Sequence, residues 1–157
     1  MISLSLRTLA FVVLMPATVV IYVPWLILSS TGEPLDLSGW RALGLIPLAV
    51  GVAVLLVCFG GFIVQGRGTP APYDPPRRLV TGALYERVRN PMYVGVTAAL
   101  VGESIVFGSP AILAWAVTMW VIFHLFVVLY EEPGLQDRFD GAYDDYRRRV
   151  PRWIPRI

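Results

Sequence analysis

Long apolar runs alternate with short polar or proline-rich segments along the chain. The first two runs, residues 8–28 and 42–64, carry no charged side chain, and at 21 and 23 residues each is long enough to cross about 30 Å of hydrocarbon. Two further runs, residues 92–107 and 111–130, are separated only by the Gly-Ser-Pro sequence of residues 108–110, which predicts a tight helical hairpin. The pattern therefore predicts an all-α integral membrane protein, a single domain with four transmembrane helices.

The tail, residues 134–157, shows a different periodicity. Its apolar side chains recur at spacings of three and four residues, as on one face of a helix: Leu135, Phe139, Tyr143, Tyr146 and Val150. Aspartates and arginines occupy much of the remaining surface. This predicts a C-terminal amphipathic helix that lies on the membrane or docks onto the bundle, with Trp153 as an anchor at the headgroup level.

Small residues mark the faces on which the helices are expected to pack. Gly51 and Gly60 lie in the second run, and Gly95, Ala99 and Gly102 lie roughly on one face of the third. Without bulky side chains, such faces let helix backbones approach closely. For the third run we expect the fourth helix, or a ligand, to occupy that face.

The composition supports a membrane protein and excludes several other classes. Hydrophobic residues make up 56% of the chain and charged residues 15%, whereas a soluble domain carries about 25% charged residues. The net charge of +2 is too small for a nucleic-acid-binding surface. A single cysteine, Cys58, excludes an intrachain disulfide, and a single histidine, His124, excludes a multi-histidine metal cluster, so we expect no metal.

The basic residues predict the orientation in the membrane. All thirteen are arginines, and only Arg41 lies on one side of the predicted spans, while the other twelve lie on the opposite side. The positive-inside rule then places both termini and residues 65–91 in the cytoplasm. The absence of lysine is typical of a GC-rich bacterial genome, which suggests a bacterial inner membrane.

Two short segments are candidates for chemistry. Arg89-Asn90-Pro91 is typical of a helix start flanked by a cytoplasmic arginine, but free N–H groups at such a start also favour a carboxylate or phosphate. Glu131 and Glu132, at the expected carboxyl end of the fourth helix, are unfavourably placed in the helix dipole. They are either a solvated pair at the membrane boundary or face cationic groups, namely Arg87, Arg89 or a cationic ligand.

The hairpin brings these segments together. Counting back from the turn near Ser109, Glu131 lies near the level of Arg87, and His124 lies near Val94, one residue from Tyr93. His124 and Glu131 are seven residues apart and share a helix face. We therefore expect one cytoplasm-facing pocket, lined by Arg89, Asn90, Tyr93, His124 and Glu131. The alternative for His124 is a hydrogen-bonded packing residue.

Glu103 lies deep in the third run, where a carboxyl group is costly unless it is protonated or paired. We expect a structural role for it, through a hydrogen bond to Ser104, Thr118 or the indole of Trp115. A functional role stays open.

Several segments together resemble one known superfamily. They are GRGTPAP from Gly66, VRNPMYVG, the Gly102-Glu103 step, YEEP, and the tail sequence FDGAYDDYRRRVPRWIP. In order, spacing and membrane setting they resemble the small integral-membrane methyltransferases, which comprise isoprenylcysteine carboxyl methyltransferases and phospholipid N-methyltransferases. The resemblance implies that S-adenosylmethionine binds between the last two membrane helices and the cytoplasmic tail.

The resemblance also implies roles for individual residues. The candidate catalytic residues are Arg89, Glu131 and His124. The candidate cofactor-binding residues are Gly66, Gly68, Tyr85, Val88, Asn90, Pro91, Tyr93, His124, Glu131 and Glu132. Candidate substrate-binding residues are Arg138, Tyr143 and Tyr146. The chain departs from the family pattern at Asn90, where the carboxyl methyltransferases commonly have His, and at Asp140, where the family usually has Gly.

These interpretations lead to one expected function and two rivals. We expect an S-adenosylmethionine-dependent methyltransferase, with membrane lipids around it and a lipid or prenylated acceptor. The acceptor is an isoprenylcysteine-like carboxylate, held by Arg89 or Arg138, or a phospholipid amine, deprotonated by Glu131 or His124. The rivals are a non-catalytic scaffold or assembly protein on the same fold, and a small transporter or channel subunit.

Overall fold

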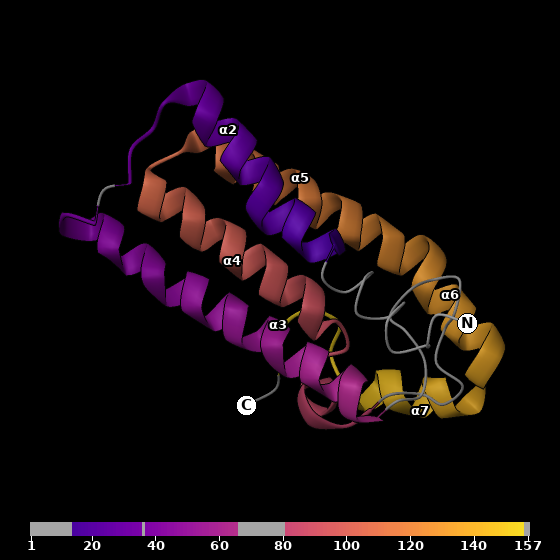
Figure 1. The fold of residues 1–157 in the computed structure, drawn as a ribbon. Coiled ribbons are helices and arrows are strands. Elements are labelled where there is room, and N and C mark those ends of the chain that lie inside the picture. The colour runs from indigo at the N-terminus through magenta and orange to yellow at the C-terminus, as the bar shows by residue number, and fades with distance from the viewer. Residues whose placement is uncertain (1–13, 36, 66–80, 156–157) are drawn as a thin grey trace, which may run out of the picture.

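The computed structural model describes residues 14–35, 37–65 and 81–155, and within these ranges every regular element is a helix (Figure 1). The elements, in chain order, are η1 (Thr18–Tyr22), α2 (Val23–Thr31), η2 (Gly39–Gly44), α3 (Leu45–Gln65), η3 (Ala83–Glu86), α4 (Pro91–Phe107), α5 (Pro110–Phe126), η4 (Val127–Glu131), α6 (Glu132–Phe139) and α7 (Gly141–Arg149). The expectation of an all-α fold is confirmed for these ranges.

Three helical segments are long and apolar enough to cross a membrane: Leu14–Thr31, Gly39–Gly60 and Pro110–Phe139. The helix α4 runs beside them, but its 17 residues, about 26 Å long, place it at the short limit for a span. The chain is therefore a membrane protein with three candidate spans, and the crossing of the bilayer by α4 stays a prediction.

The closest helix pair is α3 with α4, whose backbones meet at glycines. A Cβ atom added at Gly51 would lie 2.5 Å from both the Ala99 nitrogen and the Gly95 oxygen. A Cβ atom added at Gly102 would likewise meet backbone atoms of Leu48 and Gly44. The expectation that α5 occupies this face of α4 is wrong, because α3 fills it.

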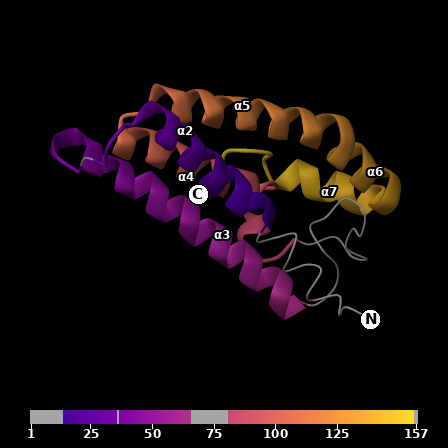
Figure 2. The same ribbon diagram turned by 45° about the horizontal axis from the view of Figure 1, so that its top comes forward.

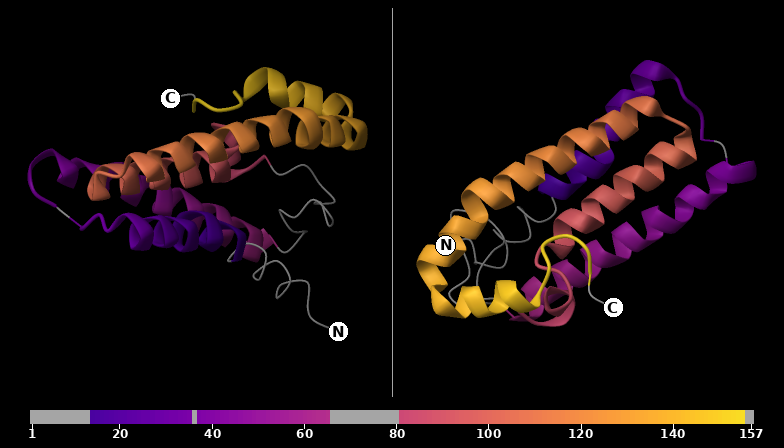
Figure 3. Two further views of the ribbon diagram at one scale, coloured as in Figure 1. Left: turned by 90° about the horizontal axis from the view of Figure 1, so that it is seen from above. Right: turned by 180° about the vertical axis from the view of Figure 1, so that it is seen from behind.

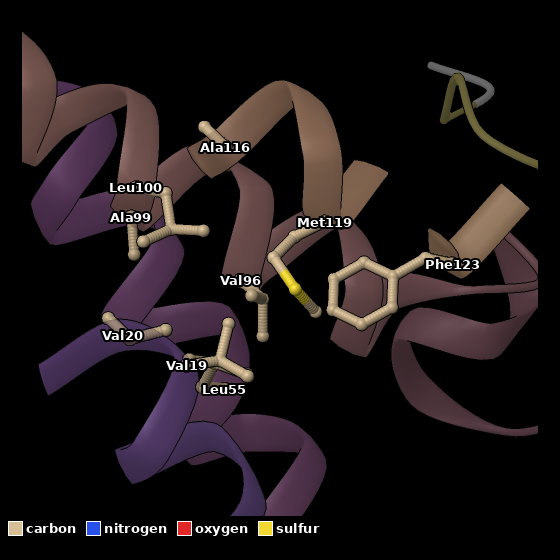
Figure 4. Close-up of a cluster of buried hydrophobic side chains, with 9 residues drawn as sticks. All are labelled: Val19, Val20, Leu55, Val96, Ala99, Leu100, Ala116, Met119 and Phe123. Carbon is tan, nitrogen blue, oxygen red and sulfur yellow. The ribbon is translucent and has the colours of Figure 1, made fainter. Parts of the chain in front are cut away.

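Side chains from four helical elements form the main hydrophobic core (Figure 4). Its buried members are Val19 and Val20 of η1, Leu55 of α3, Val96, Ala99 and Leu100 of α4, and Ala116, Met119 and Phe123 of α5. The turn between α4 and α5 has the predicted form. Gly108 adopts a left-handed conformation with φ of 63°, and the Ser109 side chain accepts a hydrogen bond from the Ile112 N–H at 3.3 Å.

Two π-helical turns interrupt the α-helices, and each ends two residues before a proline. The turn η1 precedes Pro24, and the Val23 N–H bonds to the Thr18 oxygen, five residues back. In that register the next donor would be Pro24, which has no N–H to offer the Val19 oxygen. The Trp115 indole N–H donates to the Val19 oxygen instead, at 3.0 Å, and this hydrogen bond links α5 to η1.

The turn η4 also combines a π-helical hydrogen bond with a following proline. Here the last membrane helix continues past its expected end. The Glu132 N–H bonds to the Val127 oxygen, and Pro133 follows. A wider turn accommodates the proline ring, so the helix does not end near Tyr130 but continues through α6 to Phe139. The sequence-based boundary at residue 130 is therefore wrong.

The tail consists of two short helices rather than one. Asp140, with φ of 38°, separates α6 from α7, and α7 turns back toward the bundle (Figure 2). The expected apolar side chains are present, but they pack against one another between the two helices. They form a second hydrophobic cluster: Leu135, Phe139, Tyr143, Tyr146 and Val150. The chain after α7 then crosses the end of the bundle near the start of α4 (Figure 3).

Candidate functional site

The site forms where the C-terminal segment, residues 150–155, meets the start of α4. The Arg89 backbone N–H donates to the Pro151 oxygen at 2.9 Å, and the Asn90 side chain donates through Nδ2 to the Arg152 oxygen at 3.2 Å. Asn90 occupies the N-cap position as predicted, but its side chain makes no cap hydrogen bond. Asn90 therefore holds the C-terminal segment instead of capping the helix.

One carboxylate joins two arginines at this junction. Glu132 Oε1 accepts from Arg89 at 2.8 Å, and both Glu132 oxygens accept from Arg152, at 2.9 and 2.8 Å. The side chains of Arg89 and Glu132 are 12% and 14% exposed, and that of Arg152 is 33% exposed. Hydrogen bonding to Glu132 raises the pKa of Arg152. We refer to Arg89, Glu132 and Arg152 as the arginine–glutamate cluster, which carries a net charge of +1.

Glu131 makes a different contact. Its Oε2 accepts a hydrogen bond from the Tyr93 hydroxyl at 3.1 Å, and the Tyr93 ring packs against Phe123 with 4.7 Å between ring centroids. The expected proximity of Glu131 and Tyr93 is thus present. Arg87 is exposed, and the described contacts of Glu131 do not include an arginine.

The glutamate that faces arginine is therefore Glu132, and the expectation for Glu131 is wrong on this point. The reason lies in η4. A π turn adds one residue to the helical repeat and rotates every later side chain by about 100° relative to an uninterrupted α-helix. Glu132, eight residues after His124, consequently takes the face that regular spacing assigns to Glu131.

His124 contacts two indole rings. Trp153 donates from Nε1 to His124 Nδ1 at 3.2 Å, with ring centroids 5.9 Å apart. Trp120 stacks on the imidazole at 5.4 Å and an interplanar angle of 20°. Trp153 was expected at the headgroup level, but it packs against the main core and bonds to His124. The histidine is thus both a hydrogen-bonded packing residue and a neighbour of the cluster.

The remaining predicted residues have clear positions. Val88 is buried, and the Tyr146 hydroxyl donates to the Tyr85 oxygen at 2.7 Å, which docks α7 onto η3. Burial raises the pKa of Tyr146 to about 12. Tyr143 is buried and its hydroxyl accepts from Arg89 at 3.3 Å, whereas Arg138 is exposed. A role of these side chains in substrate binding stays a prediction.

Two predicted residues, Gly66 and Gly68, lie outside the described ranges.

Glu103 is remote from the cluster, and its three expected partners bond elsewhere: Ser104 to Val101, Thr118 to Ala114 and Trp115 to Val19. Among the described residues, Glu103 Oε2 is buried without a hydrogen-bond partner. The same ranges hold no group of three His, Cys, Asp or Glu side chains placed to bind a metal.

Sequence reasoning missed Trp120, Arg152 and Trp153 as members of the site. The indole of Trp120 carries no signal that separates it from other apolar residues of a membrane helix. Arg152 and Trp153 lie in the conspicuous sequence Pro-Arg-Trp-Ile-Pro, but nothing in the helical pattern brings that segment back to residues 89 and 90.

Comparison of the sequence with known proteins identifies the family. The family model described as phospholipid methyltransferase matches residues 41–142, well over half of the chain. The chain belongs to the phospholipid methyltransferase family. The match covers α3, α4, α5 and both glutamates of the site, but it ends before Arg152 and Trp153.

Curated relatives share the same region. Protein-S-isoprenylcysteine O-methyltransferase of Schizosaccharomyces pombe is 34% identical over 80 residues, 50% of this chain and 34% of the relative. Protein-S-isoprenylcysteine O-methyltransferase B of Arabidopsis thaliana is 34% identical over 79 residues, 50% of this chain and 40% of the relative. Methanethiol S-methyltransferase 2 of Bradyrhizobium diazoefficiens is 29% identical over 107 residues, 68% of this chain and 36% of the relative. The chain thus matches between a third and two fifths of the length of these relatives.

Proposed function

We propose that this family member is an S-adenosylmethionine-dependent methyltransferase of the membrane, acting on a hydrophobic or lipid-linked acceptor at the cytoplasmic face. Family membership supports this proposal, as do relatives named for O-methyl and S-methyl transfer. A non-catalytic scaffold or a transporter subunit is not favoured, because the relatives' names describe enzymes. The arginine distribution supports a cytoplasmic site with both termini on that side. The absence of lysine supports a bacterial inner membrane.

The observation that carries the proposal is the convergence of polar side chains at one end of apolar helices. The arginine–glutamate cluster, the Tyr93–Glu131 pair and the His124–Trp153 pair all lie where α4, the end of the continuous α5–η4–α6 helix and the C-terminal segment meet. Desolvating so many polar groups is costly, so a site of this kind in a membrane protein is a functional candidate.

The residues present fit a methyl donor that carries both charged and polar groups. Arg89 Nε is buried without a hydrogen-bond partner among the described residues, so one donor of the cluster is unused. We assign cofactor binding to Arg89 and Asn90 at the start of α4, with Tyr93, Glu131 and Glu132 beside them. When bound, S-adenosylmethionine supplies an electrophilic methyl group, which passes to the acceptor as the carbon–sulfur bond breaks.

The chain's own residues then have to orient the acceptor and manage its proton. A carboxylate acceptor carries no proton to remove, and exclusion of water near the membrane boundary weakens the competing solvation of the anion. An amine or thiol must lose a proton, and the Glu131 carboxylate, next to Tyr93, is the base that we assign. The net positive cluster favours an anionic acceptor group over a cationic one.

Binding of the methyl donor to purified protein in nanodiscs tests the proposal. Calorimetry should show S-adenosylmethionine and S-adenosylhomocysteine competing for one site, and ligand at a hundredfold excess over Kd should stabilise the fold by about 2.7 kcal/mol. Transfer of a labelled methyl group to N-acetyl-S-farnesylcysteine, methanethiol and phosphatidylethanolamine then separates the acceptor classes. Absence of both heat and thermal shift would overturn the proposal.

A further inference from the structure

His124 is the single histidine of the chain, and its ring orientation has a chemical consequence. The indole N–H of Trp153 points at His124 Nδ1, at 3.2 Å. Tryptophan Nε1 is a donor only, so Nδ1 must supply the lone pair. In a neutral imidazole the proton then lies on Nε2, and the ring has no second lone pair available.

Two indole rings that pack against the imidazole also hold it in place. Trp120 stacks on it from within α5, four residues earlier in the same helix, and Trp153 contacts it from the C-terminal segment. The two indoles are themselves in contact, with 6.4 Å between centroids. Rotation of the imidazole by half a turn about the Cβ–Cγ bond would exchange Nδ1 for Cδ2, so a C–H group would face the Trp153 N–H and the hydrogen bond would be lost.

The position of Trp153 depends in turn on the site. Its neighbour Arg152 is bound by Glu132 through its guanidinium and by Asn90 through its carbonyl oxygen, and Pro151 is bound by the Arg89 N–H. Three consecutive residues of the C-terminal segment thus contact four residues of the candidate site. The segment therefore transmits the geometry of the arginine–glutamate cluster to the imidazole.

We infer that Trp153 is a positioning residue that fixes His124 as the Nε2–H tautomer, so that this histidine acts as a hydrogen-bond donor and not as a general base. The inference deepens the proposed function and rests on it for the role in methyl transfer. An amine or thiol acceptor then gives its proton to Glu131, and a carboxylate acceptor requires no base. The Nε2–H group is offered to an oxygen or nitrogen acceptor atom of the ligand.

Because the chain has one histidine, nitrogen NMR reports on this ring alone. Protein with ¹⁵N-labelled histidine, in nanodiscs without ligand at mildly alkaline pH, should give one set of ring signals, with Nε2 protonated and Nδ1 unprotonated. Trp153→Phe keeps an aromatic ring and removes the N–H donor. We expect it to shift the ring to an averaged or Nδ1–H signal.

The matched control is Trp120→Phe, which alters the stacking partner but leaves the Trp153 N–H in place, and we expect it to keep the Nε2–H signal. Melting curves check that both variants are folded. An averaged tautomer in the parent protein, an unchanged tautomer in Trp153→Phe, or the same change in Trp120→Phe would each overturn the inference. The measurement needs no cofactor, so a fixed tautomer without S-adenosylmethionine binding would refute the proposed function alone.

Discussion

Replacing Glu132 with Gln removes the one negative charge that Arg89 and Arg152 share. Two guanidinium groups then lie close together, one of them largely buried. Loss of one partner from a buried ion pair costs about 3–5 kcal/mol, and the partial exposure of Arg152 places the cost near the lower limit. For a chain of this size we expect Glu132→Gln to lower the melting temperature by roughly 6–12 °C, measured by thermal denaturation in nanodiscs.

Glu131→Gln is the matched control, because it changes the neighbouring carboxylate and keeps an oxygen that accepts from the Tyr93 hydroxyl. Only the charge assistance of that hydrogen bond is lost, which costs about 1 kcal/mol. A larger loss of stability in Glu131→Gln than in Glu132→Gln would contradict the arrangement of the two glutamates described above.

Tyr146 predicts a dependence of stability on alkaline pH. Burial raises its pKa from the usual value near 10 to about 12, so the folded protein holds the phenol proton more tightly than the unfolded chain. The resulting stabilisation is complete below pH 10 and is lost as the pH rises toward 12. We expect the difference in melting temperature between the parent and Tyr146→Phe to shrink over this range. A constant difference would show that the hydroxyl does not titrate in this way.

At the residue scale, sequence reasoning identified most members of the candidate site and the proximity of Tyr93 to Glu131, but not the other pairings. Arg89, Asn90, Tyr93, His124 and Glu132 all lie at the junction of α4 with the C-terminal segment. Their pairing follows from a one-residue shift in helix phase and from the return of the tail, and both are tertiary effects. Residue type alone does not encode either one.

At the scale of elements, Gly51→Ala tests the contact between α3 and α4. The added methyl group would lie 2.5 Å from backbone atoms of Gly95 and Ala99, and backbone cannot move aside as a side chain can. Overpacking of this kind costs about 1–3 kcal/mol. Gly60→Ala, in the same helix but with nothing within 4 Å of the new atom, should be neutral or slightly stabilising. Equal melting temperatures for the two variants would contradict the packing.

The boundaries of the elements show where local patterns are sufficient. The Gly108–Pro110 turn was predicted correctly, because its chemistry is local: a left-handed glycine, a serine cap and a proline at the first helical position. Pro24 and Pro133 were visible in the sequence as well. A proline signals that one backbone hydrogen bond is absent, but whether the helix bends, ends or widens into a π turn depends on the neighbours that satisfy the freed carbonyl.

For the whole molecule, cysteine labelling tests the predicted orientation. With Cys58 first changed to Ala, cysteines at Thr81 and Gly141 should react with a membrane-impermeant maleimide only from the cytoplasmic side. A cysteine at Leu35 should react only from the opposite side. The physical reason is the twelve-to-one distribution of arginines about the predicted spans. The reverse labelling pattern would place the candidate site in the compartment that lacks the methyl donor.

The bundle as a whole was predictable from hydropathy because every membrane helix must satisfy its own backbone hydrogen bonds. Which helices contact one another within the bundle was harder to predict. Chain order suggested α5 as the partner of the small face of α4, yet α3 fills that face with glycines of its own. Complementarity between two faces decides such a contact, and a one-dimensional pattern does not contain it.

The unbroken helix from Pro110 to Phe139 also relates the site to the thickness of the bilayer. Its 30 residues extend about 45 Å, roughly 15 Å more than the hydrocarbon layer. If Pro110 lies at one hydrocarbon boundary, Glu131 and Glu132 lie at the other, at the depth where acyl chains end and headgroups begin. An amphiphile diffusing in that leaflet would meet the site by lateral motion, without leaving its monolayer. Acyl-chain length then becomes a variable of the proposed reaction, because a thicker or thinner bilayer displaces these carboxylates from the headgroup plane.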